Sequence, residues 1–471
     1  MGCKTFLDTV HGYITVPSEY CKEFVDTENF QRLRRIEQLS SRSLFPCARH
    51  DRFVHSLGVY HIGKQILKSA RKTCEAITKE QEVSFQIACL LHDVGHSPFS
   101  HTLENLFGTV DDLFQDFKAM AAENRVNDDF GDVDLMRSDV KPHEILSALL
   151  CITTYKEGIV RLGGSPSLVS RMIMGFSYRN LDKSLDDCLI SLLHGDVIDA
   201  DKIDYICRDK WASGYQSNSV DIDRIIRALR IIEKEGKFQI AYSKIALYEI
   251  NALIDNKNFQ ANWIFKHHQV VYEQKIFLDA VKSLVGCLFK DPAVPSSKLF
   301  DYHSFFRKVD VCEGCSVYML SDDDIIHLMK SHRDEIPTFN EWLSRKYNYK
   351  PLWKTYSEMI ALLGNVLSAR IMTDKGGVYD VIVNMIKDKY KVNVFSLDST
   401  PKIKSIQKGQ ILISFGDTIC DFTELGLPPK EDVYAGRTFK YIFIDRTLFE
   451  DNPVKQKQSI LDDIRHIIFN Q

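Results

Sequence analysis

A dense group of metal-binding and proton-transferring side chains follows a short apolar run before position 92. His92 and Asp93 end that run, and His96, His101 and Glu104 come shortly after them. Imidazole and carboxylate groups bind divalent metals, and both transfer protons in enzymes. Their burial in an apolar environment is costly unless they are paired or bound to a metal. The segment therefore indicates a metal-dependent hydrolase if further ligands lie nearby in the fold.

The run before His92 has the pattern of a buried helix. Thr78 and Gln81 have the spacing of a capping box at its start, and the apolar residues that follow cover a broad surface. A turn rich in Gly, Ser and Pro comes next, and it lets His96 and His101 fold back over the helix end. We therefore expect the cluster to lie at one end of a core helix.

A second helix is predicted from Arg52 to about Ala70, with His55 on its inward apolar stripe. Arg52 precedes His55 by three residues and shares that face. A lone inward His is usually an ordinary core residue, but an inward Arg beside it suggests an anion next to a metal. His50 and His61 lie off the stripe, and we expect both at the surface.

A third helix carries Asp201, Tyr205 and Asp209 at intervals of four residues, so the three share one face. The simplest interpretation is a solvated face with ion pairs between residues one turn apart. That interpretation accounts for Asp204 and Arg208. It does not account for a tyrosine between two aspartates on a helix whose other positions include several isoleucines.

Composition narrows the class of protein. The chain has 471 residues, of which 44% are hydrophobic and 26% charged, and its formal net charge is −4. These values are typical of a soluble globular protein and give no global basic field for nucleic acid. Twelve scattered cysteines, many in apolar runs, are typical of reduced core thiols in a cytoplasmic protein. Cys312 and Cys315 form a single CxxC pair, which alone gives little support for a zinc knuckle.

We expect a mainly α fold with a smaller C-terminal α+β region. Residues 1–290 would form the main helical domain, 291–370 a helical extension and 371–471 the α+β region. Within the first domain, residues 105–142 are acidic and weakly periodic, and we interpret them as an exposed insertion. Helix is expected to continue from the Asp201 helix to about Phe289.

Three short segments near the C-terminus have the β-branched and aromatic content of strands. They are residues 392–395, 411–415 and 441–444. Flanking helices are predicted at 378–390 and 459–469.

Three segments together resemble one known family. They are Arg52–Gly58, His92–His101 and Asp199–Tyr205. They are similar to motifs of the HD-superfamily deoxynucleoside triphosphate triphosphohydrolases, which include SAM-and-HD-domain dNTPases and bacterial dGTPase-like proteins. The resemblance covers about residues 1–290. It implies an HD-domain helical core that hydrolyses deoxynucleoside triphosphates to a deoxynucleoside and inorganic triphosphate.

The resemblance also implies roles for individual residues. The implied metal ligands are His55, His92, Asp93 and Asp201. The implied catalytic group is His96, His101, Glu104 and His143, with Glu104 standing where the family has Asp. The implied substrate contacts are Arg52 and Lys202 on phosphate, Gln38, Tyr205 and Asp209 on the sugar, and His268 and Tyr272 on the nucleotide.

The implied cofactor is a divalent metal ion, with Mn, Fe, Mg, Zn and Ni all compatible with His and Asp ligands. Expected partners are deoxynucleoside triphosphates and further copies of the chain, with an allosteric nucleotide left open. No membrane partner is expected, and nucleic acid lacks support. One alternative is an HD phosphohydrolase acting on nucleoside monophosphates or cyclic nucleotides. Another is a nucleotide-sensing or nucleic-acid-binding module with a degenerate site, although all four ligand positions are filled.

Overall fold

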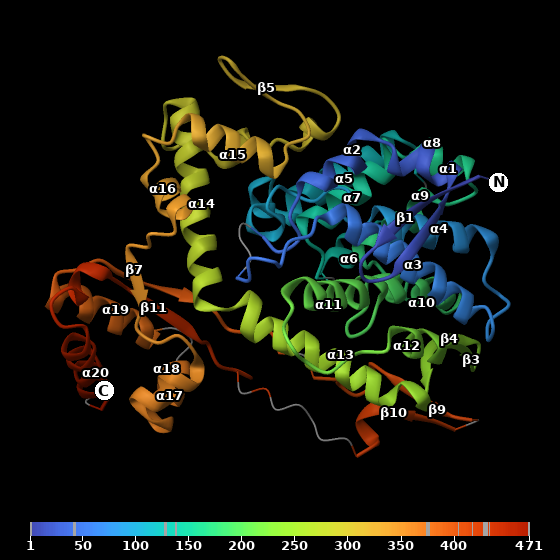
Figure 1. Ribbon diagram of the computed structural model, residues 1–471. Coiled ribbons are helices and arrows are strands. Elements are labelled where there is room, and N and C mark those ends of the chain that lie inside the picture. The colour runs from blue at the N-terminus through green and yellow to red at the C-terminus, as the bar shows by residue number, and fades with distance from the viewer. Residues whose placement is uncertain are drawn as a thin grey trace. The chain divides into compact units, whose positions relative to one another are not determined.

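The computed structural model describes residues 2–40, 44–126, 130–136, 139–373, 377–403, 405–416, 418–426, 432 and 434–469. The chain is mainly helical, as predicted, with a few small sheets (Figure 1). It divides into two compact units, each assembled from separate stretches of sequence. The first comprises residues 1–256, 281–332 and 406–429, and the second comprises residues 257–280, 333–405 and 430–471. Each unit is described by itself.

The core of the first unit is a group of helices around α4. They are α3 (Arg52–Ala70), α4 (Lys79–Leu91), α7 (Pro142–Ile152), α9 (Pro166–Met174), α10 (Ser184–Leu193) and α11 (Ala200–Ser213). Helix α4 contacts α3, α9 and α10, and its residues from Val83 to Leu91 are buried except for Gln86. The predicted capping box is present, since Thr78 and Gln81 exchange side-chain and backbone hydrogen bonds. The start of α3 at Arg52 is also as predicted, because Asp51 accepts a hydrogen bond from the backbone N–H of Val54.

Smaller elements complete the first unit. Its short helices are α1 (Ser18–Tyr20), α2 (Glu28–Arg32), α5 (Val110–Glu123), α6 (Asp132–Met136), α8 (Lys156–Arg161), α12 (Ile222–Ala228) and α15 (Asp322–Ser331). Two hairpins are β1 (Cys3–Asp8) with β2 (Gly12–Pro17) and β5 (Val309–Cys312) with β6 (Cys315–Val317). Helices α13 (Leu247–Gln260) and α14 (His268–Phe289) each run from one unit into the other.

A four-stranded sheet contradicts the expectation of continuous helix up to residue 289. Strands β3 (Leu229–Lys234) and β4 (Lys237–Ser243) form an antiparallel hairpin around a Glu-Gly turn. Strand β9 (Leu412–Phe415) then pairs parallel to β4, and β10 (Thr418–Asp421) completes the order β10-β9-β4-β3. Residues 406–429 therefore belong to the first unit, which differs from the predicted division into three consecutive regions. The pairing of β4 with β9 joins residues far apart in the sequence, so no local sequence pattern could predict it.

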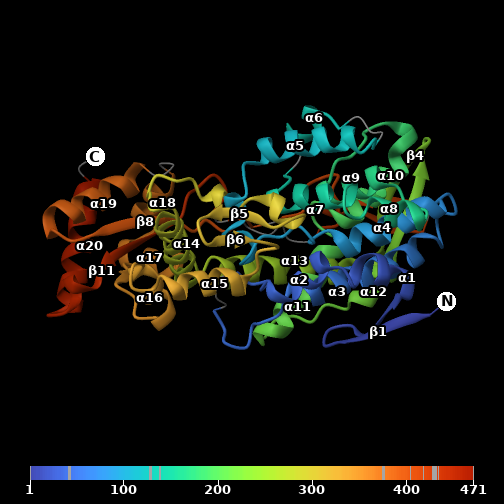
Figure 2. The same ribbon diagram turned by 90° about the horizontal axis from the view of Figure 1, so that it is seen from above.

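Residues 105–142 are not an exposed insertion throughout. Helix α5 lies against α7 (Figure 2). Phe114 and Phe117 on α5 are fully buried. Its apolar stripe needs a partner face, and α7 supplies one. The acidic residues Asp128 and Asp129 lie outside the described residues.

The second unit contains two of the three predicted C-terminal strands, β8 and β11, whereas the third, β9, belongs to the first unit. Its sheet has the order β7-β11-β8, with both pairings antiparallel, from β7 (Tyr349–Pro351), β8 (Val394–Asp398) and β11 (Lys440–Asp445). The accompanying helices are α16 (Pro337–Ser344), α17 (Tyr356–Leu363), α18 (Asn365–Thr373), α19 (Gly377–Tyr390) and α20 (Pro453–Phe469). Helices α19 and α20 confirm the two predicted flanking helices.

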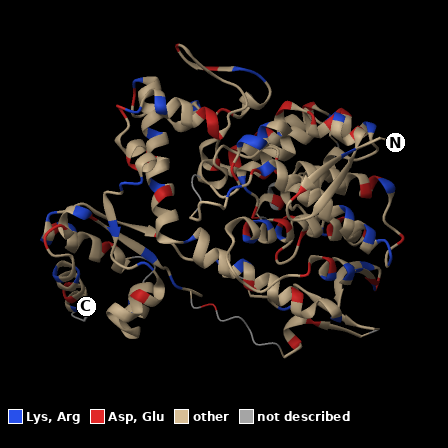
Figure 3. Cartoon of the chain, viewed as in Figure 1, with Lys and Arg blue, Asp and Glu red and all other residues tan. Residues whose placement is uncertain are grey.

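Charge and hydrophobicity in the structure agree with the composition. Lys and Arg are interspersed with Asp and Glu on the helices of both units (Figure 3), in keeping with the net charge of −4. Among the described helices, none combines the length and hydrophobicity that crossing a bilayer requires. Cys89, Cys151 and Cys188 are buried, as predicted, and Cys207 is partly buried.

Candidate active site

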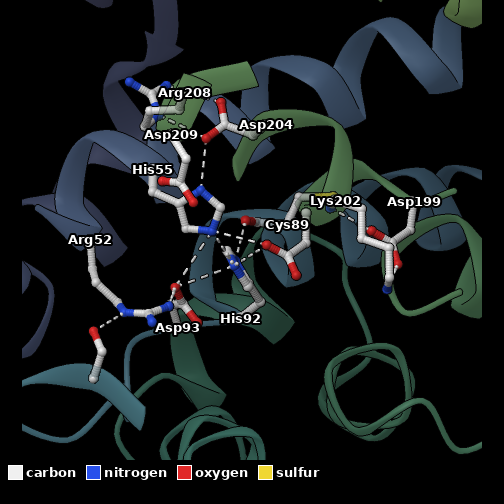
Figure 4. A network of polar contacts seen from close by, with 12 residues as sticks. Arg52, His55, Cys89, His92, Asp93, Asp199, Lys202, Asp204, Arg208 and Asp209 are labelled. Carbon is white, nitrogen blue, oxygen red and sulfur yellow. Dashed lines mark hydrogen bonds and ion pairs between the residues drawn. The ribbon is translucent and has the colours of Figure 1, made fainter. Parts of the chain in front are cut away.

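Four side chains from three elements converge in the first unit. His55 comes from α3, His92 and Asp93 follow directly on α4, and Asp201 comes from the first turn of α11. The Nε2 atoms of His55 and His92 are 3.3 Å apart, and each lies 3.5–3.6 Å from Oδ2 of Asp93. Oδ1 of Asp201 is 3.0 Å from Nε2 of His55 and 3.9 Å from Nε2 of His92. These are the four residues that the resemblance implied as metal ligands, and Figure 4 labels His55, His92 and Asp93 among them.

The hydrogen bonds on the far side of each imidazole fix which nitrogen faces the cluster. Nδ1 of His55 donates to Oδ2 of Asp204 at 2.7 Å, and Nδ1 of His92 donates to the carbonyl of Cys89 at 3.1 Å. A neutral imidazole then presents a lone pair at Nε2. When both imidazoles are neutral, their Nε2 lone pairs face carboxylate oxygens of Asp93 and Asp201, and positive charge between them, from a metal ion or from a proton on His55, satisfies the arrangement.

The donor set fits a divalent metal ion. Ligands at about 2.0–2.2 Å from a metal lie about 3.0–3.5 Å from one another, close to the separations seen here. Two imidazoles and two carboxylates suit several first-row metals and leave coordination positions open. The residues thus fit a metal, and the ligand types do not select among Mn, Fe, Mg, Zn and Ni.

The electrostatics of the cluster also favour positive charge. Burial lowers the pKa of His55, but Asp201 and Asp204 outweigh it and raise that pKa to about 10. Burial opposes ionisation of Asp93, yet Arg52 and the neighbouring histidines hold the pKa of Asp93 well below its usual range. The pKa of Asp201 is lowered in the same way, chiefly by His55 against the effect of burial. Both carboxylates are therefore ionised and available to a cation.

Asp204 and Arg208 are not the solvated ion pair that the sequence suggested. Both side chains are buried, and Arg208 donates to both oxygens of Asp204 at 2.8 and 2.9 Å. Asp204 also binds His55 and accepts a 2.6 Å contact from Nε2 of His11, while Arg208 reaches Asp8 at 2.7 Å. The carboxylate therefore orients a predicted ligand from behind. The sequence signal for it is the second nitrogen of His55, which needs an acceptor when His55 binds metal.

A second cluster contains His96, His101, Glu104 and His143, the four residues predicted as the catalytic group. Oε2 of Glu104 accepts from Nδ1 of His143 at 2.8 Å and from Nδ1 of His101 at 3.1 Å. The His96 ring is stacked on His143 with centroids 4.1 Å apart. Nε2 of His143 also lies 3.9 Å from Oδ1 of Asp93, which connects the two clusters.

Charge differs among these side chains. His96 is fully buried, both of its ring nitrogens lack a hydrogen-bond partner among the described residues, and burial lowers its pKa well below the usual range. His96 is therefore neutral. Desolvation by the groups around His101 lowers its pKa and Glu104 opposes that shift, although about half of the side chain is exposed (53%). Glu104 is ionised, because the two imidazoles lower its pKa against the effect of burial.

Arg52 is placed as the sequence predicts. Its NH1 atom donates to Oδ2 of Asp93 at 2.5 Å, and its Nε atom donates to Oγ of Ser100 at 2.9 Å. The NH2 atom is buried without a partner among the described residues. An unsatisfied guanidinium nitrogen beside a metal-ligand carboxylate is suited to an anionic group.

Lys202 lies differently from the expected phosphate contact. Its ammonium group binds Oδ2 of Asp199 at 2.5 Å and the carbonyl of Gly195 at 2.7 Å (Figure 4). Asp199 caps α11, so it holds both the helix start and the lysine. These two contacts occupy two of the three ammonium N–H donors, and the assignment of Lys202 to phosphate stays a prediction.

Asp209, one of the predicted sugar contacts, already has a partner inside the first unit. That partner is His50, which was expected at the surface. His50 is buried, and its Nε2 atom contacts Oδ1 of Asp209 at 2.7 Å. The prediction of an exposed His50 is therefore wrong, because Asp209 needs a partner inside the unit. His61 is half-buried and contacts Gln65, so it is not a fully exposed residue either.

Tyr205 and Gln38 complete the predicted sugar group. Tyr205 is half-buried on α11, and Oε1 of Gln38 is buried without a partner among the described residues. The loop that follows Gln38 lies partly outside the described residues.

His268 and Tyr272 belong to the second unit. The Tyr272 hydroxyl donates to Glu341, and its ring lies among Tyr347, Phe395 and Phe443. This environment is that of a core residue in that unit. The assignment of His268 and Tyr272 to nucleotide binding stays a prediction.

Comparison with known proteins defines the class. Residues 52–148 match the HD domain family, a range that contains His55, His92 and Asp93 and the whole second cluster. This stretch of the chain therefore matches an HD domain, in agreement with the resemblance found in the sequence motifs. Asp201 lies beyond the matched range.

Particular relatives give more detail. The chain is 29% identical over 280 residues to a deoxynucleoside triphosphate triphosphohydrolase SAMHD1 homolog from Dictyostelium discoideum, covering 58% of this chain and 46% of that protein. It is 32% identical over 243 residues to deoxynucleoside triphosphate triphosphohydrolase SAMHD1 from Danio rerio, covering 50% and 38%. The chain thus spans less than half the length of these two relatives. A solved phosphohydrolase from Bacteroides thetaiotaomicron shares the fold, with a TM-score of 0.61, 20% identity and coverage of 94% and 100%.

Proposed function

We propose that this protein hydrolyses deoxynucleoside triphosphates to a deoxynucleoside and inorganic triphosphate, in a reaction that requires a divalent metal. The observation that carries the proposal is the convergence of four lone-pair ligands on one point, next to the unsatisfied NH2 atom of Arg52. A metal ion and a phosphate bound together satisfy both features. The two triphosphohydrolase relatives, which this chain matches over half its length, support the same substrate class.

The metal, when bound, supplies a Lewis acid for a phosphate oxygen and activates a water molecule. Asp93 and Asp201 contribute two negative charges to its ligand set. Arg52 both orients Asp93 and offers its free nitrogen to the α-phosphate. Lys202 would add a second cation near the triphosphate through the ammonium N–H that binds neither Asp199 nor Gly195.

The second cluster supplies the proton for the departing 5′-oxygen. His101 is the proposed donor, because its side chain is half exposed and Glu104 orients it through Nδ1. His143 shares Glu104 and is the reserve candidate. His96 is excluded from this role, because its ring is fully buried and no described residue orients it by a hydrogen bond.

The face of α11 beyond Asp201 is suited to sugar selection. Residues four apart on a helix are about 6 Å apart along its axis, so Tyr205 and Asp209 stand one and two turns from the metal. His50 fixes Asp209, whose carboxylate accepts a hydrogen bond from a 3′-hydroxyl. The Tyr205 ring would press on C2′ and leave no room for a ribose 2′-oxygen.

The test is a substrate panel of dGTP, GTP, dGMP and a cyclic nucleotide, each with and without added metal. The proposal predicts metal-dependent turnover of dGTP, slower turnover of GTP, and a smaller difference between the two in Tyr205→Ala. The matched control is Asp93→Ala, which should lose bound metal and activity together.

Three results would count against this account. Equal rates on GTP and dGTP would end the sugar-selection argument. Turnover of the monophosphate or cyclic nucleotide alone would favour a different HD phosphohydrolase. Stoichiometric metal in purified Asp93→Ala would contradict the ligand assignment.

A further inference from the structure

The loop between His96 and His101 has an unusual backbone. Phe99 and Ser100 have φ values of 54° and 53°, in the left-handed region that non-glycine residues rarely adopt. Two consecutive residues in that region cost free energy unless their surroundings hold them. Because the loop carries two histidines of the second cluster, whatever holds it also sets their positions.

Asp322 holds this loop from a distant part of the sequence. Its Oδ1 atom accepts a 2.6 Å hydrogen bond from the backbone N–H of Phe99. Its Oδ2 atom accepts a 3.0 Å hydrogen bond from the backbone N–H of Glu37, the residue before Gln38. One carboxylate therefore joins the histidine loop to the segment that carries a predicted sugar contact.

The carboxylate of Asp322 is not needed by its own helix. Ser321 and Asp324 form the capping box of α15, so the cap of that helix is made without Asp322. Asp322 is nonetheless only 7% exposed. Burial raises its pKa to about 7, and the two backbone donors and Arg32 oppose that shift. Burying an acid that the helix start does not use points to a role in the loop it contacts.

Arg32 forms a hydrogen bond with the other end of the same loop. Its NH2 atom donates to the carbonyl of His96 at 2.6 Å, and its Nε atom donates to the carbonyl of Leu320 at 2.7 Å. The guanidinium is buried over the Phe305 ring, with 4.7 Å to the centroid. Residues 320–322 thus hold the His96 carbonyl through Arg32 and the Phe99 N–H directly.

We call the contacts of Arg32 and Asp322 with the His96–His101 loop and Glu37 the brace. Further hydrogen bonds connect this brace to the metal-ligand cluster. Oγ of Ser100 donates to the carbonyl of Glu37 at 2.5 Å and accepts from Nε of Arg52 at 2.9 Å. Arg52 in turn binds Asp93. A shift of Glu37 or Phe99 would therefore move the group that orients a predicted metal ligand.

We propose that Asp322 is a positioning residue of the active site, which fixes the His96–His101 loop and Glu37 so that His101, Arg52 and Gln38 meet the substrate together. This inference rests on the proposed function. It also makes residues 320–322 part of the active site's support, although they lie far beyond the matched HD domain.

The test compares Asp322→Asn with Asp323→Asn. An asparagine side chain offers one oxygen to two N–H groups, so one donor loses its partner while the shape is kept. Asp323 is the adjacent residue, its side chain is 70% exposed, and it pairs with Arg35 at 3.4 Å, which makes it a matched control. Two readouts are measured in both variants: amide hydrogen exchange in residues 96–101, and kcat and KM for dGTP.

Asp322→Asn should exchange the loop amides faster, retain its metal and lower kcat by roughly 10- to 100-fold, because small misplacements of catalytic groups have effects of that size. Asp323→Asn should match the unmodified protein. Unchanged loop exchange in Asp322→Asn, or a kcat close to that of the unmodified protein, would overturn the proposal. Faster exchange in a protein that hydrolyses no nucleotide would uphold the brace and reject the proposed function.

Arg32→Lys provides a second variant in case Asp322→Asn fails to fold. A single ammonium group cannot span the two carbonyls that the guanidinium joins. The same faster exchange and lower kcat are expected, and loop exchange equal to that of the unmodified protein would contradict the brace.

Discussion

The three histidines of the second cluster differ in their hydrogen-bond partners and in exposure. His96 is neutral and has no acceptor among the described residues, whereas His101 and His143 both bind Glu104. The family that the sequence resembles has Asp at the position of Glu104. The longer Glu104 side chain contacts both imidazoles. A single carboxylate therefore orients two potential donors, and exposure favours His101.

Replacing His101 by Ala should leave metal binding intact and lower turnover by about 10²–10⁴-fold, the usual contribution of a positioned proton donor. His303→Ala is the matched control, because His303 is similarly half exposed and its Nδ1 atom contacts Asp301 at 2.7 Å. Steady-state rates and metal content are measured for both. A loss smaller than about tenfold would move the donor role to His143.

The resemblance to the HD-superfamily triphosphohydrolases implied the four ligands and the second cluster, but not the residues that contact them. His55, His92, Asp93 and Asp201 were predicted because their motifs are local in sequence. Asp204 was interpreted as a surface residue, because its contacts to His11 and His55 join residues far apart in the chain. The partnership of His50 with Asp209 was missed for the same reason.

At the scale of elements, one glycine determines how closely α3 approaches α11. A Cβ atom on Gly58 would lie 2.0 Å from Oδ1 of Asp204 and 2.5 Å from NH2 of Arg208. Both of those side chains are buried and hydrogen-bonded, so neither can move aside cheaply. Gly58 is therefore required for Asp204 to reach His55.

Gly58→Ala should displace Asp204, lower metal affinity by about 10- to 100-fold and destabilise the fold by about 1–3 kcal/mol. Gly158→Ala in α8 is the control, because its added Cβ would lie 3.1 Å from Glu23, away from the metal ligands. Metal titration and thermal unfolding measure the two effects. Normal metal affinity in Gly58→Ala would show that Asp204 does not act through His55.

Helix starts were predictable because their signals are local. The caps at Asp51, Thr78 and Ser321 are each completed within three residues. The β3–β4 hairpin was not predicted, because its isoleucines continue an apolar pattern that also suits a helix. The parallel partner of β4 is β9, which begins at Leu412, and no local sequence pattern predicts a pairing over that separation.

At the scale of the molecule, the proposed site is larger than the matched domain. The HD match ends at residue 148, but Asp201, Asp204 and Asp322 lie beyond it. All belong to the first unit, which draws on three separate stretches of the chain. The assembled unit, rather than the HD motif alone, is therefore the part expected to perform the chemistry.

The central claim is that water attacks the α-phosphorus and the 5′-oxygen departs with a proton from His101. A single turnover of dGTP in H₂¹⁸O, followed by mass spectrometry of both products, tests it most directly. The account predicts ¹⁸O in inorganic triphosphate and an unlabelled deoxyguanosine. Release of orthophosphate or pyrophosphate, or ¹⁸O in the nucleoside, would contradict it.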